Sequence, residues 1–138
     1  MSSVSFVVPV FNKSLYLKHV VNSILSQKGD FDKEYIFIDD GSTDDSLKIL
    51  KKETRSLKNC KIITQKNKGS ANATNIGINM AKMKYIKFLD ADDVILSNAT
   101  LCLLNLLEKN RDSVLAYGLQ RKVEKIKSVD LDEAFDCN

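Results

Sequence analysis

The sequence predicts an α/β fold in three layers, with helices on both faces of a mostly parallel central sheet. Three observations predict this fold. Short runs of β-branched and aromatic residues alternate with longer segments whose apolar residues recur every three or four positions. Several strand-like runs are apolar throughout, which is typical of parallel strands covered on both faces. Polar turns follow these runs directly, and alternating strands and helices produce right-handed βαβ crossovers.

The first unit is a strand followed by an amphipathic helix. The strand is expected at residues 4–10 and ends near Pro9, which has no amide hydrogen to donate to a central ladder. From Ser14, apolar residues recur at helical spacing as far as Leu25. Gly29 then closes the pattern, as glycine commonly does beyond the end of a helix.

The next two units repeat this order. The second strand, residues 35–38, is apolar throughout and stops at a turn that begins with two aspartates. A helix through residues 47–50 is expected after the turn, capped by one of the polar residues 42–44. The third unit consists of a strand, a polar turn and a helix rich in small residues, at residues 62–64, 65–70 and 71–80.

The fourth unit ends in another acidic turn. Residues 85–89 read as a strand that stops at Asp90-Ala91-Asp92-Asp93. Residues 99–107 are strongly apolar at helical spacing, and residues 114–117 predict a short fifth strand. Residues 121–138 are mixed and charged, and no element is predicted there.

Composition limits the class of protein. The 138 residues are 43% hydrophobic and 28% charged, which is typical of one folded domain with a core. The net charge of +3 comes from lysines interspersed with acids, which argues against a nucleic-acid partner. No apolar run is long enough for a membrane span, and no basic start indicates a signal peptide. Cys60, Cys102 and Cys137 lack CxxC spacing, which favours reduced thiols in a cytoplasmic protein over a disulfide framework or zinc cluster.

The strand ends carry the chemistry of the sequence. Ligands of open α/β sheets bind beyond the carboxyl ends of the strands, which here are residues 9–13, 39–43, 65–72 and 90–93. Two of these four segments begin with acidic pairs. Carboxylates gathered at one edge repel one another unless a cation or hydrogen-bond donors lie between them. The pattern therefore predicts a divalent metal or a hydroxyl-rich ligand.

The turn after the fourth strand is the candidate metal site. Asp90 and Asp92 are two positions apart and can converge on one Mg²⁺ or Mn²⁺ ion that keeps positions open for phosphate oxygens. The alternative is that Asp92 or Asp93 caps the turn that follows. An EF-hand loop is excluded, because Ile95 stands where that loop requires glycine.

The turn after the second strand is the candidate base or ribose site. Asp39 or Asp40 can accept a hydrogen bond from the ring N–H of a base or from ribose hydroxyls. A turn glycine and a helix cap are the simpler interpretation of Gly41, Ser42 and Asp44.

The small residues after the third strand have two interpretations. They suit the approach of backbone amides to a phosphate, with Lys66 and Lys68 adding positive charge, or close packing of a helix on the sheet. The GxGxxG and GxxxxGK[ST] phosphate loops are both absent. His19, the single histidine, lies among apolar helix positions and is interpreted as a packing or surface residue.

Four motifs occur in order across residues 4–93, about two thirds of the chain. They are Val4-Ser5-Phe6-Val7-Val8-Pro9-Val10-Phe11-Asn12 with Leu15 and Ile24-Leu25-Ser26-Gln27, Ile38-Asp39-Asp40-Gly41-Ser42-Thr43-Asp44, Asn67-x-Gly69 with Ala73-x-Asn75-x-Gly77, and Tyr85-Ile86-x-Phe88-Leu89-Asp90-Ala91-Asp92-Asp93. Together they resemble the nucleotide-sugar-binding half of the family 2 glycosyltransferases, which have the Rossmann-like GT-A fold. The whole chain, residues 1–138, is expected to be one such domain without the acceptor-binding half.

The resemblance implies a set of site residues. Those implied to bind the nucleotide sugar are Pro9, Val10, Phe11, Asn12, Asp39, Asp40, Gly69, Asn72, Asp90 and Ala91. Asp40, together with Asp39, would hold the base, usually uracil, or the ribose. Asp90 and Asp92 would form a DxD motif that binds Mn²⁺ or Mg²⁺, with Asp92 the more direct ligand and Asp90 nearer the ribose and sugar.

The implied activity is inverting transfer of a sugar from a nucleotide diphosphate sugar, first of all a UDP-sugar, to a hydroxyl of a carbohydrate or lipid-linked acceptor. Polysaccharide or glycoconjugate synthesis would be its setting, in the cytoplasm or at the inner face of the membrane. Thr74 departs from the pattern, because the family usually has arginine there, and Lys13, Lys66 or Lys68 are candidates to replace that charge.

The chain ends about 45 residues after Asp93. The catalytic base therefore stays unassigned, and a non-catalytic nucleotide-binding or interaction module is the alternative function. A nucleotidyltransferase is disfavoured, because the first strand lacks a glycine-rich basic loop after it. Apolar surface around an unfinished sheet predicts a homodimer.

Overall fold

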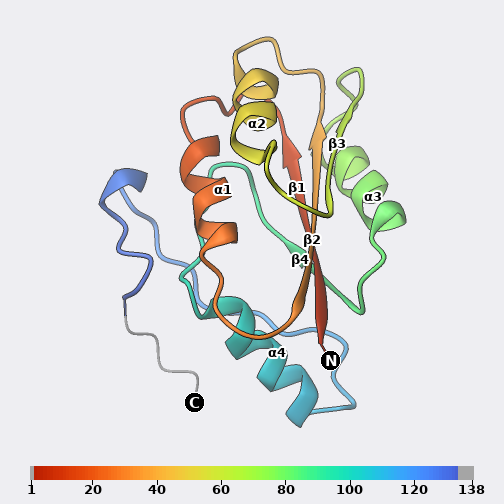
Figure 1. Ribbon diagram of the computed structural model, residues 1–138, viewed down its shortest axis with the longest axis vertical. Coiled ribbons are helices and arrows are strands. Elements are labelled where there is room, and N and C mark those ends of the chain that lie inside the picture. Colours follow the sequence, from red (N-terminus) through yellow and green to blue (C-terminus); the bar gives the residue numbers. More distant parts are fainter. Residues whose placement is uncertain (1, 134–138) are drawn as a thin grey trace.

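The computed structural model describes residues 2–133, which form a parallel sheet with helices on both faces (Figure 1). The strands are β1 (Ser3–Val10), β2 (Asp32–Asp39), β3 (Cys60–Thr64) and β4 (Tyr85–Phe88). The helices are α1 (Leu17–Leu25), α2 (Ser46–Thr54), α3 (Ser70–Met80) and α4 (Ala99–Lys109), and a 3-10 turn, η1, follows at Ile126–Ser128. The predicted order of the first four strands and four helices is confirmed.

The register of the sheet brings the strand ends to one edge. The strand order is β3-β2-β1-β4, and every pair is parallel. Val10 of β1 pairs with Asp39 of β2, which pairs in turn with Thr64 of β3. The chain after β4 continues beside β1, because the Leu89 amide donates to the Val7 carbonyl at 3.2 Å. Loops after all four strands therefore lie toward the upper end of the sheet in Figure 1.

Two cores hold the layers together. Alternate residues of β1 point to opposite faces, as the two-residue period of a strand requires. Phe6 and Val8 join the larger core, which α1, α2 and α4 cover. Val7 joins the smaller core beneath α3, together with two isoleucines of β2. Helices thus cover both faces of the sheet, as the sequence predicts.

Close packing explains the small residues of α3. Ala73 is fully buried against the sheet. A Cβ atom on Gly77 would lie 2.3 Å from Cγ1 of Val7 and 2.9 Å from Cδ1 of Ile38. The packing interpretation therefore holds for these two positions of α3, since the helix can approach β1 and β2 only where side chains are minimal.

The expected fifth strand at residues 114–117 is not formed. Within residues 2–133 the sheet ends at β4, and the segment after α4 has no strand pairing. Val114 is 99% exposed and Tyr117 is 84% exposed. The prediction failed because a short apolar run indicates only suitability for a strand, whereas pairing depends on whether the chain returns to an open sheet edge.

The cysteines depart from the expectation of reduced thiols. Cys60 is free and partly buried, but Cys102 of α4 is disulfide-bonded. Cysteine count and spacing cannot reveal this, because a disulfide depends on approach in space. Cys137 lies outside the described residues. No helix in the described part of the chain is long and apolar enough to cross a membrane.

Candidate active site

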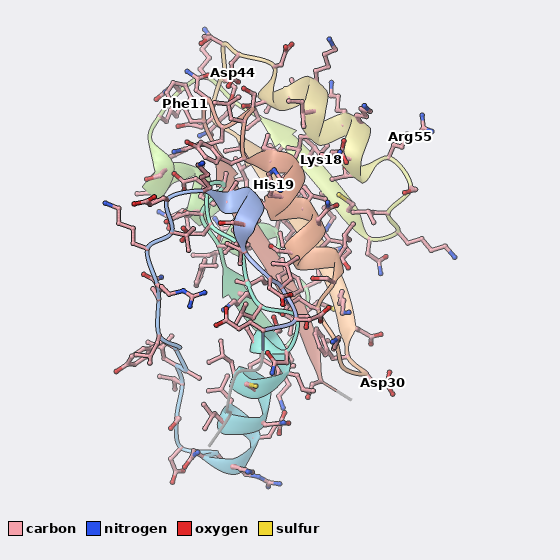
Figure 2. The ribbon with its side chains drawn as sticks, turned by 90° about the vertical axis from the view of Figure 1, so that its left-hand side faces the viewer. Phe11, Lys18, His19, Asp30, Asp44 and Arg55 are labelled. Atoms are coloured by element: carbon pink, nitrogen blue, oxygen red, sulfur yellow. The ribbon has the colours of Figure 1, made fainter. Side chains whose placement is uncertain are left out.

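Four loops meet at the carboxyl edge of the sheet. They are residues 11–16 after β1, 40–45 after β2, 65–69 after β3 and 89–98 after β4. Figure 2 shows Phe11 of the first loop and Asp44 of the second near each other at one end of the molecule, with Asp30 at the opposite end. The strand ends singled out from the sequence are therefore brought together.

Asn12 joins the first loop to the second. Its backbone has a φ of 51°, a left-handed conformation that asparagine adopts more readily than most residues. Its side-chain Oδ1 accepts hydrogen bonds from the amides of Thr43 at 2.8 Å and Asp44 at 3.3 Å. Its own amide donates to Oγ of Ser42 at 3.1 Å. The side chain of Asn12 is thus engaged with the turn after β2.

Asp44 strengthens the same junction. Its carboxylate accepts from the amide of Ser14 at 3.1 Å and from that of Ser46, the first residue of α2, at 2.9 Å. Burial alone would raise its pKa, but these hydrogen bonds lower the pKa to about 2. The N-cap of α2 is Asp45, one residue later than the cap expected among residues 42–44, and Asp44 contributes a hydrogen bond to Ser46 from the position before it.

Asp40 organises the third loop. Its carboxylate is almost fully buried and accepts hydrogen bonds from Nε2 of Gln65 at 2.7 Å and from the amides of Lys68 and Gly69, both at 2.8 Å. Burial works to raise the pKa of Asp40, yet the three donors hold it below its usual range. Both oxygens of Asp40 are therefore engaged with loop 65–69.

Asp39 differs from its neighbour. The residue is 3% exposed, and its Oδ1 atom is buried without a hydrogen-bond partner among residues 2–133. A buried acceptor left unpaired is costly, and most such groups in native proteins find a donor in protein, water or ligand. Asp39 therefore offers an acceptor at the carboxyl end of β2, where an incoming N–H or O–H group would be stabilised.

The acidic turn after β4 meets the first loop through an ion pair. Nζ of Lys13 lies 2.5 Å from Oδ2 of Asp92. The amide of Asp93 donates to the carbonyl of Asp90 at 3.1 Å, which closes the turn. Burial raises the pKa of Asp93, and the negative charges of Asp90 and Asp92 raise it further. The turn thus concentrates negative charge, and Lys13 offsets part of it.

The donor set suits a hard cation that keeps open positions. Asp90 and Asp92 are exposed and supply carboxylate oxygens, which are the ligands that Mg²⁺ and Mn²⁺ prefer. Within residues 2–133, no three histidine, cysteine or acidic side chains are grouped so that they could hold a metal ion. A cation here would therefore be held by one or two carboxylates, with other ligands supplied by water or phosphate.

The remaining predicted residues lie on or beside these loops. Val10 and Ala91 are buried. Phe11, Gly69 and Asn72 are exposed, and Pro9 is partly buried. Gly69 has a φ of 89°, which favours glycine at the entry to α3.

The bracing of the loops was not predicted from the sequence. The sequence predicts Asn12 and Asp40 as ligand contacts and Asp44 as a local cap, and in the structure each also fixes a neighbouring strand-end loop. Contacts between residues about 30 positions apart leave no local pattern. One signal for such contacts can be read from the sequence. Short polar side chains follow several parallel strands, and the topology brings the ends of those strands together.

Comparison with known proteins agrees with this geometry. The model of the family described as glycosyl transferase family 2 matches residues 5–133. The chain is 34% identical over 122 residues to a chondroitin synthase of Escherichia coli, covering 88% of this chain and 18% of that protein. It is 38% identical over 114 residues to the glycosyltransferase GlyG of Streptococcus pneumoniae, covering 81% of this chain and 38% of that protein.

A solved structure shares the fold. The TarS protein of S. aureus, residues 1–349 in complex with UDP, superposes with a TM-score of 0.71 at 25% sequence identity, over 88% of this chain and 38% of that one. The chain spans less than half the length of each of these relatives. Family match, fold and strand-end motifs agree, and the chain therefore belongs to glycosyl transferase family 2 and has its GT-A fold.

Proposed function

We propose that this chain is the donor-binding part of an inverting glycosyltransferase that transfers a sugar from a nucleotide diphosphate sugar to an acceptor hydroxyl. The observation that carries the proposal is that the acidic turn Asp90–Asp93 and the unpartnered Asp39 belong to loops at one edge of the sheet. The acidic turn suits the phosphate end of such a donor, and Asp39 suits its nucleoside end. The UDP-GlcNAc complex described for TarS supports a UDP-sugar as the donor class.

The two aspartates after β2 are given different tasks. We infer that Asp39 accepts a hydrogen bond from the base or ribose, because its Oδ1 has no partner among the described residues. Asp40 holds loop 65–69, which includes Gly69, beside the nucleotide. Backbone groups of residues 9–12 form the other side of the proposed pocket, and Asn72 lies in the first turn of α3.

The acidic turn is the proposed metal site. Asp92, with Asp90, would hold Mn²⁺ or Mg²⁺ as a DxD motif, and the backbone of buried Ala91 would lie beside the sugar. When bound, the cation would neutralise the negative charge that develops on the leaving diphosphate. Asp93 is exposed as a residue, but partial desolvation of its carboxyl and the charges of its neighbours hold its pKa above the usual value, so it takes up a proton more readily than an ordinary aspartate.

A second candidate function is a binding module without turnover. It is favoured by Thr74, which occupies the position where an arginine is usual in the family. The catalytic base stays unassigned in either case.

A carbohydrate or lipid-linked acceptor and a role in polysaccharide synthesis fit the chondroitin synthase relative. A location in the cytoplasm or at the inner face of the membrane stays a prediction.

The decisive experiment is calorimetric titration of UDP into the chain with and without Mn²⁺. We expect binding that requires Mn²⁺ and that is lost in Asp92→Ala. The matched control is Asp30→Ala, which removes an exposed carboxylate at the opposite end of the molecule (Figure 2) and should bind as the unmodified chain does. Absence of binding to UDP, GDP and dTDP at millimolar concentration would contradict the proposed donor site. Equal binding by Asp92→Ala would remove the metal assignment.

A further inference from the structure

Lys13 places a positive charge on the residue proposed as the metal ligand. Its Nζ lies 2.5 Å from Oδ2 of Asp92, across the gap between the first and fourth strand-end loops. This is the only ion pair that the acidic turn makes within residues 2–133.

The backbone of Lys13 is fixed while its charged end is accessible. Its amide donates to Oγ of Ser46 at 2.8 Å, and the flanking residues Asn12 and Ser14 are hydrogen-bonded to the turn after β2. The side chains of Lys13 and Asp92 are 35% and 41% exposed. Lys13 is thus anchored at its base, and its ammonium can leave Asp92 without any change in the sheet.

A divalent cation bound to Asp92 would share the same carboxylate with the Lys13 ammonium. Asp92 has two carboxylate oxygens, and its Oδ2 is occupied by Nζ. An ammonium at hydrogen-bond distance also repels an approaching cation, and the repulsion is felt most where water is partly excluded. Of the three aspartates in the turn, Asp92 is the one so occupied.

We propose that Lys13 is an internal counter-ion that competes with the divalent cation for Asp92. It balances the acidic turn while no metal is bound, and it must give up Asp92 for metal to bind there. Lys13 is therefore a positioning residue that sets the metal concentration at which the donor site forms. This inference rests on the proposed function, because it takes Asp92 as a metal ligand.

The test is a Mn²⁺ titration of the ¹⁵N-labelled chain followed by paramagnetic broadening of the amide signals of Ala91 and Asp93. This readout locates the ion and needs no catalytic activity. Removing the competing charge in Lys13→Gln should lower the Mn²⁺ concentration at half-broadening about fivefold, near the upper end of what a partly exposed ion pair contributes. A merely structural role of Lys13 would shift the midpoint the other way, because a disordered turn binds metal more weakly.

Two further variants separate competition from general charge effects. Lys18→Gln removes the same charge from an exposed position on α1 (Figure 2) and should leave the midpoint unchanged. Lys13→Arg keeps a cation that can pair with Asp92, so it should stay close to the unmodified chain.

The outcomes distinguish this inference from the proposed function. If the midpoint of Lys13→Gln equals or exceeds that of the unmodified chain, competition is refuted even where UDP and Mn²⁺ bind. If the signals of the turn show no broadening by millimolar Mn²⁺ in any variant, with or without UDP, the metal site itself is refuted and the competition with it.

Discussion

Single carboxylates at the strand ends hydrogen-bond to neighbouring loops. Their state of ionisation therefore affects the stability of the folded chain. Asp44 accepts hydrogen bonds from two amides, and Asp40 accepts from two amides and a side-chain N–H group. A protonated carboxyl is a weaker acceptor for all of these donors. Both aspartates have a pKa below the ordinary value, so both favour the folded state in their ionised form.

The pKa of Asp44 predicts a specific loss of stability in acid. Its pKa is about 2 in the folded chain against 3.8 for an ordinary aspartate. A lowered pKa contributes stability that is present above pH 3.8 and is lost as the pH falls toward 2. Because Asp44 is exposed, we expect a contribution of about 1 kcal/mol after solvent screening.

Thermal unfolding at several pH values from 5 to about 2 measures this effect. Asp44→Asn should be less stable than the unmodified chain at pH 5, and the difference should shrink in acid. Asp30→Asn serves as the exposed control and should follow the unmodified chain throughout. A constant difference between Asp44→Asn and the unmodified chain at every pH would contradict the assignment.

At the scale of elements, the close packing of α3 on the sheet depends on very small residues at its inner face. Gly77 lets the helix axis approach Val7 and Ile38, and Ala73 is fully buried beside them. The position of this helix matters for the site, because its N-terminal end follows loop 65–69, which Asp40 holds.

Substitution at Gly77 tests this packing. Gly77→Ala should destabilise the chain by about 1–3 kcal/mol, because the added methyl would meet Cγ1 of Val7 at 2.3 Å. This cost exceeds the roughly 1 kcal/mol that alanine gains over glycine inside a helix. Urea unfolding measures the change, and Gly118→Ala is the control, since nothing lies within 4 Å of the added atom there. Equal or greater stability of Gly77→Ala would show that α3 can move outward at no cost.

The elements with strong periodicity could be predicted from the sequence, because strands and helices buried on known faces leave patterns of period two or 3.6. The segment from Ser14 to Leu25 shows the helical period and contains α1, whereas residues 4–10 and 35–38 are short apolar runs that end at polar turns and lie within β1 and β2. The apolar run at 114–117 failed, since its pairing would depend on a neighbour rather than on its own pattern. That the strand-end loops lie together could be predicted from the parallel topology. The roles of Asn12, Asp40 and Lys13 could not, because they depend on contacts that no local pattern encodes.

At the scale of the whole molecule, apolar surface is left uncovered beyond α4. Val114, Leu115, Tyr117 and Leu119 are all at least 70% exposed. The space bounded by this segment and the end of α4 is a shallow hollow of about 210 Å³. Where exposed apolar side chains of this kind form one patch, the patch commonly marks an interaction surface.

The homodimer expected from the sequence is a prediction of this scale. Size-exclusion chromatography with light scattering should give twice the chain mass of 15.5 kDa at micromolar concentration. Replacing Leu115 and Leu119 together by lysine should yield monomers, because the two charges would resist burial. Lys48→Glu and Lys51→Glu, on the exposed side of α2, are the control pair and should leave the mass unchanged. A monomeric unmodified chain would contradict the prediction.

The mutual bracing of the strand-end loops also bears on the cost of binding. A flexible pocket loses conformational entropy when a ligand orders it, and that loss weakens the affinity. Here Asn12, Asp40 and Asp44 hold the first three loops in one arrangement before any ligand arrives. The charged end of Lys13 and the acidic turn are partly exposed and joined by a single ion pair, so they can rearrange more easily than the braced loops. For the proposed nucleotide sugar, the edge would be preorganised toward the nucleoside and adjustable toward the phosphates. Recognition of the base would then be nearly rigid-body, while local movement would accommodate metal and diphosphate.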